Sequence, residues 1–269
     1  MEDEKLENFY EAWSSKSTAE VDYDIEASIR KVEVIASSLP QDISRNIHSI
    51  LDFGCGYGAF LQHFQEKLGI SRGIGVDFSA SAIKIASQKF EGDALKFYKL
   101  ETLDIAENVA YLDSIIPEGV DCILLVDLLE HVPDCRTLVS SLAKFTKYFI
   151  IKLPVESSFF DNYILPKEYP SSLHSNGHLR EFDAHNVYYF IRQLGLTPLY
   201  ETLYVYHPDD AFPPCPVNCT IKQRAVRGLI VGFKCVASWL LPKKLFLRLV
   251  GGGGYFCIAT FDRSHVLNP

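Results

Sequence analysis

SILDFGCGYG, residues 49–58, runs from an apolar segment through an acid into three alternating glycines. The apolar residues predict a buried strand that is closed by Asp52. A chain leaving the carboxyl end of a parallel strand must turn sharply. Glycine permits that turn and lets the backbone approach a ligand, because it has no Cβ. A helix over residues 59–67 would point its positive N-terminal end at the same ligand. The stretch therefore predicts a strand, a ligand-binding turn and a helix.

Two kinds of ligand-binding turn match these glycines. The stretch resembles motif I of the class I S-adenosylmethionine (SAM) dependent methyltransferases, with no gap in the spacing. Gly54, Gly56 and Ala59 also satisfy the G-x-G-x-x-G/A pattern of dinucleotide-binding proteins. Asp52 favours the methyltransferases, in which an acid at this place holds the positive end of the methionine moiety. The same acid would repel the pyrophosphate of a dinucleotide. A tight turn without a ligand is the third interpretation.

A second specific signal lies in VDLLEHVPD, residues 126–134. It closely resembles the LEHV-P segment of the methyltransferase branch that includes ubiquinone-type and many small-molecule and sugar methyltransferases. The resemblance implies that Asp127 and Leu128 line the methionine side of the pocket. It leaves His131 either a structural role, in which its hydrogen bonds fix the loop, or a catalytic one. The resemblance is good over residues 45–155 and looser up to residue 206.

The ends of two further predicted strands carry acids that suit an adenosine. Asp77 ends the second strand, where an acid accepts hydrogen bonds from ribose hydroxyls, and Phe78 would lie near the adenine. Ser79 also suits the cap of the next helix. After the third strand, Glu101 and Asp104 compete for the adenine amino group. The resemblance thus implies twelve cofactor-binding residues: Asp52, Gly54, Cys55, Gly56, Gly58, Asp77, Phe78, Ser79, Glu101, Asp104, Asp127 and Leu128.

Apolar runs alternate with helical patterns from residue 48 onward, which predicts an α/β fold with helices on both faces of a mostly parallel sheet. The predicted strands cover residues 49–53, 73–77, 95–100, 121–126, 148–153, 197–206 and 255–261. Predicted helices cover 25–39, 79–90, 135–145 and 181–194. The resemblance implies a Rossmann-like seven-stranded sheet of order 3-2-1-4-5-7-6, with the last strand antiparallel.

The chain divides into two predicted parts. Residues 1–44 are expected to form an N-terminal helical cap over the cofactor, where Tyr10, Trp13 or Tyr23 would either touch the ligands or pack on the sheet. Residues 45–269 are expected to form the methyltransferase domain. This domain would contain a substrate loop, residues 154–180, and a basic hydrophobic insertion between strands 6 and 7, residues 207–252.

The loop 154–180 follows the fifth strand at the edge where α/β sheets bind ligands. It carries aromatic residues and two histidines, His174 and His178, which suit a substrate wall. Methyl transfer depends on orientation, and a base can remove the proton of the nucleophile. We predict His178 first, His174 second and His131 third as catalytic residues, with a non-catalytic polar contact as the alternative for each. No metal-binding motif is evident, so no metal site is predicted.

Residues 211–261 contain no Asp or Glu but seven Lys and Arg residues. Within them, residues 228–241 are almost wholly apolar, and fourteen residues are too few for a bilayer span of about 20. Three interpretations follow. The segment is a lid or dimer helix, a peripheral membrane contact through residues 220–250, or a site for a phosphate-bearing substrate such as a lipid-linked or nucleotide-linked sugar.

Composition bounds the function. The chain has 269 residues, 48% hydrophobic, and a formal net charge of −8, which argues against a general nucleic-acid binder. Seven scattered cysteines indicate reduced residues of a cytoplasmic protein. We therefore predict a methyltransferase that uses SAM, releases S-adenosylhomocysteine (SAH), and methylates a small-molecule, sugar or lipid-linked acceptor on oxygen. The alternatives are an NAD(P)-dependent oxidoreductase and a non-catalytic SAM-binding protein.

Overall fold

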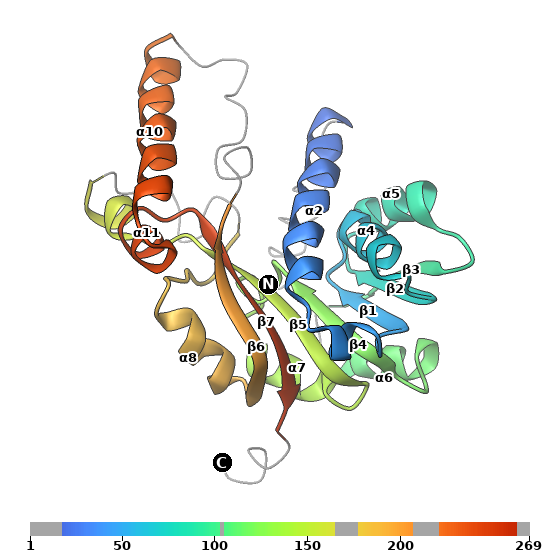
Figure 1. Ribbon diagram of the computed structural model, residues 1–269. Helices are drawn as coiled ribbons and strands as arrows, with labels where there is room; N and C mark the ends of the chain where they lie inside the picture. The colour runs from blue at the N-terminus through green and yellow to red at the C-terminus, as the bar shows by residue number, and fades with distance from the viewer. Residues whose placement is uncertain (1–17, 103–104, 165–176, 207–220, 263–269) are drawn as a thin grey trace.

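The computed structural model describes residues 18–102, 105–164, 177–206 and 221–262. One seven-stranded sheet has the order β3-β2-β1-β4-β5-β7-β6 (Figure 1). Its strands are β1 Ser49–Phe53, β2 Arg72–Asp77, β3 Leu95–Lys99, β4 Val120–Val126, β5 Thr146–Val155, β6 Leu196–Val205 and β7 Gly253–Phe261. The first five strands pair in parallel, and β7 is antiparallel to both β5 and β6. The predicted α/β class, strand order and antiparallel last strand are confirmed.

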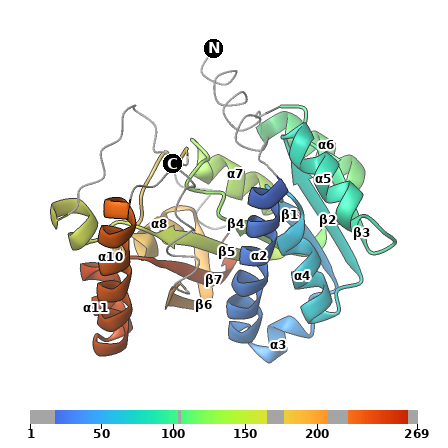
Figure 2. The ribbon, with the colours of Figure 1, turned by 90° about the horizontal axis from the view of Figure 1, so that it is seen from above.

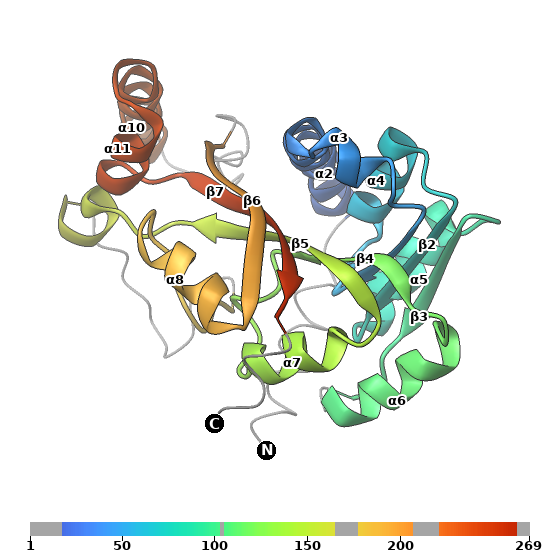
Figure 3. The same cartoon turned by 60° about the horizontal axis from the view of Figure 1, so that its bottom comes forward.

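Helices cover both faces of this sheet (Figure 3). They are α2 Thr18–Ser38, α3 Gln41–Ser44, α4 Ala59–Leu68, α5 Ala80–Phe90, α6 Ile105–Ile115, α7 Cys135–Leu142, η1 Phe160–Ile164, α8 Asn186–Gln193, α10 Ile221–Leu240 and α11 Lys243–Leu249. The helices α2, α4 and α5 pack on one face, and α6, α7, α8 and α11 pack on the other.

The core is split by the sheet into two hydrophobic clusters. Because successive strand residues point to opposite faces, Ile50 packs with α2 and α4, whereas Leu51 packs in the cluster of α6, α7 and α8. Strands β4 and β5 are buried on both faces, which explains their continuous apolar sequences.

Several features differ from the expectation: α2 begins at Thr18 rather than at residue 25, and the short helix α3 was not predicted. The helix predicted over 181–194 begins at Asn186, because the Oδ1 atom of Asp183 accepts from the backbone N–H groups of His185 (2.6 Å) and Asn186 (2.8 Å) and ends the preceding loop. Helix α6 was not predicted, although seven of its eleven residues are hydrophobic. Helix α7 ends at Leu142, three residues early.

The predicted insertion between strands 6 and 7 contains two helices in its described part. α10 extends away from the end of the sheet, and α11 turns back to it (Figure 1 and Figure 2). Phe246 and Leu247 of α11 are buried in the core, and a Cβ on Gly253 would overlap the Leu247 side chain. Among the helices of the described residues, none is long and apolar enough to cross a membrane.

Candidate cofactor and acceptor site

A cavity of about 780 Å³ opens at the carboxyl ends of β1, β2 and β4. This volume is within the range of roughly 300–1,000 Å³ for small-molecule sites. Its wall begins on α2, continues through the glycine turn after β1 and the loop after β4, and ends on α7. The place is the one at which parallel α/β sheets bind ligands.

The glycine turn after β1 forms the floor of this cavity. Gly54, Gly56 and Gly58 have φ values of +82°, +52° and +75°, a region that other residues rarely adopt. Gly54 also lies against the loop after β4, since a Cβ there would be 2.7 Å from Cδ1 of Leu128. A Cβ on Gly58 would be 2.6 Å from Cε1 of Phe97. Larger residues would therefore change the path of the turn.

Asp77 ties the turn to the end of β2. Its Oδ2 atom accepts from the backbone N–H of Gly56 at 2.8 Å, and its Oδ1 atom accepts from the N–H of Ser79 at 2.9 Å. Ser79 caps α5 by accepting from the N–H of Ala82 at 3.2 Å, as its sequence position indicated. The carboxylate of Asp77 thus faces the cavity from a fixed position.

Asp52 is a buried acid at the cavity wall. Its residue is 2% exposed, and burial together with the nearby charge of Asp77 raises the pKa of its carboxyl to about 8. A carboxyl in this state is poised for a cation, because a positive ligand charge would restore its ionised form. The wall therefore has the electrostatic character of a site for a positively charged ligand.

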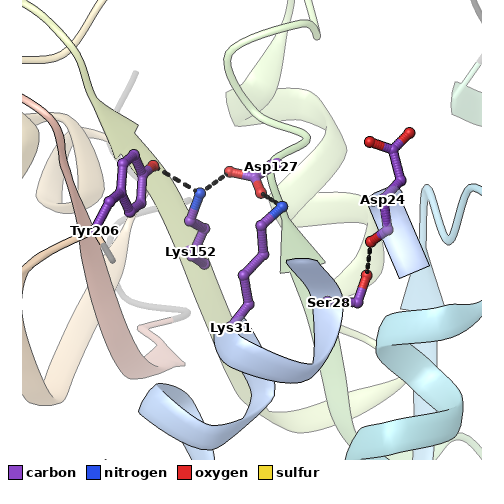
Figure 4. A network of polar contacts seen from close by, with 6 residues as sticks. All are labelled: Asp24, Ser28, Lys31, Asp127, Lys152 and Tyr206. Carbon is purple, nitrogen blue, oxygen red and sulfur yellow. Dashed lines mark hydrogen bonds and ion pairs between the residues drawn. The ribbon is translucent and has the colours of Figure 1, made fainter. Parts of the chain in front are cut away.

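Asp127 is held at the end of β4 in a left-handed backbone conformation, with φ of +50°. Figure 4 shows its carboxylate between two ammonium groups. The Nζ atom of Lys31 donates to Oδ2 at 2.9 Å, while Nζ of Lys152 donates to Oδ1 and also to the hydroxyl of Tyr206 at 2.9 Å. Burial opposes the charge of Asp127, but the two lysines outweigh it and hold the pKa of this carboxyl well below its usual range.

Sequence reasoning missed the partners of Asp127. Lys152 is 2% exposed and lies inside an otherwise apolar strand, so this lone cation was an available signal. Lys31 on α2 and Tyr206 after β6 gave no signal, because their meeting depends on the tertiary fold. A non-glycine residue with positive φ is rare, and such strain concentrates at functional sites.

Two histidines pack together beside the cavity. The rings of His131 and His178 meet edge to face, with centroids 4.8 Å apart, and Nδ1 of His178 lies 3.1 Å from Oε2 of Glu156. Nδ1 of His131 is 3.3 Å from the carbonyl oxygen of Gly177. Burial and the neighbouring His178 lower the pKa of His131 to about 4, so its imidazole is neutral at pH 7. His131 lines the cavity, whereas His178 is not among the lining residues.

Glu130 lies next to this histidine pair. It is buried, and its Oε2 atom has no hydrogen-bond partner among the described residues. Burial and the charge of Asp127 raise its pKa well above the usual range. Glu130, His131 and His178 offer one ligand atom each within 4.8 Å of one another, a grouping of donor types that divalent cations accept. No signal in the sequence pointed to this group of three residues. His178 directly follows Gly177, which is 46 positions after His131, so no local spacing pattern relates the two histidines.

Arg180 fastens the described end of the 154–180 loop to the segment after β4. Its Nη1 atom donates to the carbonyl oxygen of Val132 at 2.6 Å and to that of Leu129, and its Nη2 atom donates to the carbonyl oxygen of Pro133 at 3.0 Å. The backbone N–H of Leu179 donates to the carbonyl oxygen of Glu130 at 2.8 Å. These bonds bring the two histidines together, and the sequence alone did not single out Arg180.

Most of the predicted cofactor-binding residues meet at this cavity. Those that line it are Asp52, Gly54, Cys55, Gly56, Asp77, Phe78, Asp127 and Leu128. Gly58 and Ser79 are not among the lining residues; they shape the turn and the cap behind them. Glu101 is also absent from the wall and pairs with Lys99 at 2.7 Å. Asp104 and His174 lie outside the described residues.

Helix α2 adds residues to the wall that the sequence did not specify. Asp24, Ser28 and Lys31 line the cavity, and Figure 4 shows Lys31 reaching from α2 to Asp127. The hydroxyl of Ser28 donates to the carbonyl oxygen of Asp24 at 2.8 Å within the helix. The expected first N-terminal helix, with Tyr10 and Trp13, lies outside the described residues.

A family model described as a methyltransferase domain matches residues 22–201. Magnesium protoporphyrin IX methyltransferase from Synechocystis PCC 6803 with bound SAH aligns with a TM-score of 0.53 at 12% identity, over 92% of this chain and 89% of that one. The complex that contains the Haloferax volcanii Trm112 methyltransferase activator gives a TM-score of 0.53 at 15% identity, over 93% and 96%. An O-methyltransferase family protein from Burkholderia thailandensis gives 0.51 at 14%, over 88% and 57%.

None of the curated proteins compared with the chain matches it. At these identities the solved structures show a shared fold. The family match is more informative about the site, because residues 22–201 include every residue that lines the cavity.

Proposed function

This chain belongs to the class I SAM-dependent methyltransferases, and we propose that it methylates an oxygen atom of a small-molecule, sugar or lipid-linked acceptor. SAM is its cofactor, and SAH is the product that SAM becomes once its methyl group has been transferred. We favour oxygen because of His131, whose neutral imidazole lines the cavity wall. A hydroxyl group must lose its proton when it is methylated, and a base assists that loss.

We assign the cofactor to the floor and sheet side of the cavity. Asp77 would accept hydrogen bonds from the ribose hydroxyls, and the side chain of Phe78 would lie against the adenine. Asp52 would face the positive charge of the methionine moiety, with Asp127 and Leu128 beside it. The fit rests on Gly56, where an added Cβ would meet no protein atom within 4 Å, and on the buried carboxyl of Asp52, which a cation would ionise.

The chemistry requires little of the protein beyond position and a base. Bound SAM supplies an electrophilic methyl group, which forms a bond to the acceptor oxygen as its bond to sulfur breaks. His131 would hold the acceptor hydroxyl and take its proton on Nε2, if its Nδ1–H donates to the carbonyl oxygen of Gly177. The ring is neutral at pH 7, and its lowered pKa makes it a weaker base than an ordinary histidine, so its larger contribution is to orient the acceptor hydroxyl.

His178 then acts through His131 as a positioning residue. It packs edge to face on the His131 ring and lies beside Glu156, so it restricts the rotation of His131. The sequence analysis ranked His178 above His131; both roles, and that of His174, stay predictions. Helix α2 closes the cavity over the sheet, which supports the cap predicted over residues 1–44.

The partner proposals are limited to the acceptor. A net charge of −8 argues against nucleic acid as substrate. The described cysteines are free thiols, which supports the cytoplasmic location that we propose. A homodimer and a peripheral membrane contact both depend on the insertion, which carries the next inference.

The test is a transfer assay with SAM labelled in its methyl group. The purified protein would be incubated separately with a polar metabolite extract, a set of free and nucleotide-linked sugars, and a lipid extract, followed by mass spectrometry of labelled products. We expect label as an O-methyl group in one fraction, with the rate lowered about 100-fold or more by His131→Ala and unchanged by His185→Ala, an exposed histidine on α8's N-terminal side. Label on carbon or nitrogen contradicts the oxygen assignment. SAM binding with no transfer to any fraction favours a non-catalytic SAM-binding protein.

A further inference from the structure

The insertion leaves a broad apolar surface uncovered. Among the described side chains of α10, six large apolar ones are exposed, including Ile221 (88%), Leu229 (76%) and Trp239 (84%). We call the following set the outer surface: Ile221, Leu229, Phe233, Val236, Trp239 and Leu240 of α10, Leu245 and Leu249 of α11, and Phe159 and Tyr163 at η1. Scattered exposed apolar residues are common, but a contiguous group of this kind marks a binding surface.

The outer surface follows the helical repeat of α10. Leu229, Phe233, Val236 and Leu240 recur every three or four residues, so they share one side of the helix. Ala237, at the edge of this stripe and one turn after Phe233, is buried in the core. The larger apolar residues of α10 therefore face solvent, whereas those of an ordinary amphipathic helix face the core.

The outer surface continues from α10 onto η1. Phe160 stacks on Phe233 with ring centroids 5.6 Å apart, and Nζ of Lys234 lies 5.7 Å from the centre of the Phe160 ring. Phe159 and Tyr163 contact each other at 5.1 Å and remain exposed. Two segments that are far apart in the sequence thus present aromatic side chains together.

Positive charge accompanies the α10 and α11 part of this surface, whose segment has no acid; the η1 part contains Asp161. Lys243, Lys244 and Arg248 are exposed on α11, directly after Trp239 and Pro242. Residues 211–261 contain no Asp or Glu, although the whole chain has a net charge of −8. Tryptophan and lysine side by side at the end of an apolar helix suit the boundary between lipid and water.

We propose that the outer surface docks on an anionic lipid surface, with α10 lying in the interface rather than crossing it. The exposed apolar side chains would enter the region between headgroups and acyl chains, and the cations of α11 would contact the lipid phosphates. A second copy of the chain is the less favoured occupant. A two-fold contact would place the cations of one copy near those of the other, with no acid of residues 211–261 to pair them.

The location also relates the outer surface to the active site. η1 follows β5, whose Lys152 belongs to the Asp127 network at the cavity. A lipid-linked acceptor would then approach the cavity from the docked side; this last step rests on the proposed function, whereas docking itself does not.

The test is sedimentation with vesicles, measured without SAM or acceptor so that it is independent of the methyl-transfer assay. Vesicles of phosphatidylcholine alone are compared with vesicles of phosphatidylcholine and phosphatidylglycerol, each at low and high salt. The variants are Leu229→Ser/Trp239→Ser for the apolar side chains and Lys243→Gln/Lys244→Gln for the charges. Matched controls are Leu199→Ser on β6 and Lys67→Gln/Lys96→Gln, all exposed and outside the outer surface.

We expect the protein to sediment with the anionic vesicles, and both double variants to bind them about tenfold or more weakly, while the controls bind as the parent does. In a Trp13→Phe background, the fluorescence of Trp239 should shift to the blue on anionic vesicles. Failure to bind anionic vesicles, or binding that neither double variant weakens, overturns the proposal. A dimer that Leu229→Ser/Trp239→Ser dissociates, without vesicle binding, assigns the surface to a second copy instead.

Discussion

Two regions of the molecule differ in which side chains they bury. One is the edge of the sheet at the carboxyl ends of β1, β2 and β4, and the other is the insertion that contains α10 and α11. At the sheet edge, charged groups are buried or half-buried and held by named partners, as the half-buried Asp127 is by Lys31 and the buried Lys152. In the insertion, apolar side chains such as Leu229 and Trp239 are exposed and the cations are on the outside. Both arrangements cost stability in the isolated chain. We infer from this difference that the first region is shaped for a small polar ligand. The exposed apolar side chains of the second region need a binding partner outside the chain to cover them.

The largest effect is expected from breaking the buried ion pair. Lys152→Met should lower the free energy of unfolding by about 3 kcal/mol, the low end for breaking a buried ion pair, because Asp127 is half-buried and keeps Lys31 as its one described cationic partner. Denaturant titration measures it, with Lys147→Met, exposed on the same strand, as the control. A loss below about 1 kcal/mol would show that the network at this edge is not a fixed structure.

A smaller loss is expected from crowding the glycine turn. Gly58→Ala places a methyl group 2.6 Å from Phe97 and 2.9 Å from Ala86, at a φ of +75°. We expect it to lower stability by about 2 kcal/mol and to weaken SAM binding. Gly92→Ala is the matched control, since its added Cβ meets no atom within 4 Å. Equal thermal melting of the two variants would contradict the close packing of the turn.

The pH dependence of SAM binding should reveal Asp52. Because its pKa in the free protein is about 8, a cation that needs the ionised carboxyl must displace a proton at pH 7, at a cost of about 1.4 kcal/mol. Affinity should therefore rise as the pH approaches 8 and then level off, with nearly one proton released per SAM at pH 7. Titration calorimetry in buffers of different ionisation enthalpy measures this release.

Asp52→Asn is the control for that experiment, and it also tests the direction in which Asp52 changes stability with pH. The raised pKa of Asp52 favours folding below pH 4, and this contribution is lost as the pH rises from about 4 to 8. The Asn variant should therefore melt at a higher temperature at pH 8 without ligand, yet bind SAM more weakly and release no proton. A proton release that persists in Asp52→Asn would assign the titration to another group.

The smallest effect is expected in the insertion. Leu229→Ser/Trp239→Ser should change the free energy of unfolding by less than about 0.5 kcal/mol and leave SAM affinity unchanged, because both side chains face solvent. In contrast, Leu124→Ala in the fully buried β4 should cost about 2–5 kcal/mol. Unfolding of the insertion variant would mean that its apolar residues support the fold.

The sequence predicted what is local or repeated along the chain. Residues 49–58 indicated the strand and turn, and the strand order came with the resemblance that they carry. Asp52, Asp77 and Asp127 were found because each ends a strand whose apolar run is easily recognised. Lys31, Tyr206 and Arg180 were missed, since their partners are brought near only by the tertiary fold and no spacing rule relates them. The cluster around Glu130 was missed for the same reason.

The most direct test of the account is a calorimetric titration of SAM, SAH and NAD into the wild-type protein, Asp77→Ala and Asp113→Ala. Asp77 holds the glycine turn at the cavity, whereas Asp113 is an exposed residue of α6 that pairs with Lys144 and is not among the residues that line the cavity. We predict that both adenosyl ligands bind the wild type and Asp113→Ala, that Asp77→Ala weakens them about 100-fold, and that NAD does not bind. SAM affinity unchanged in Asp77→Ala, or binding of NAD alone, would contradict the assignment of this edge of the sheet to the cofactor.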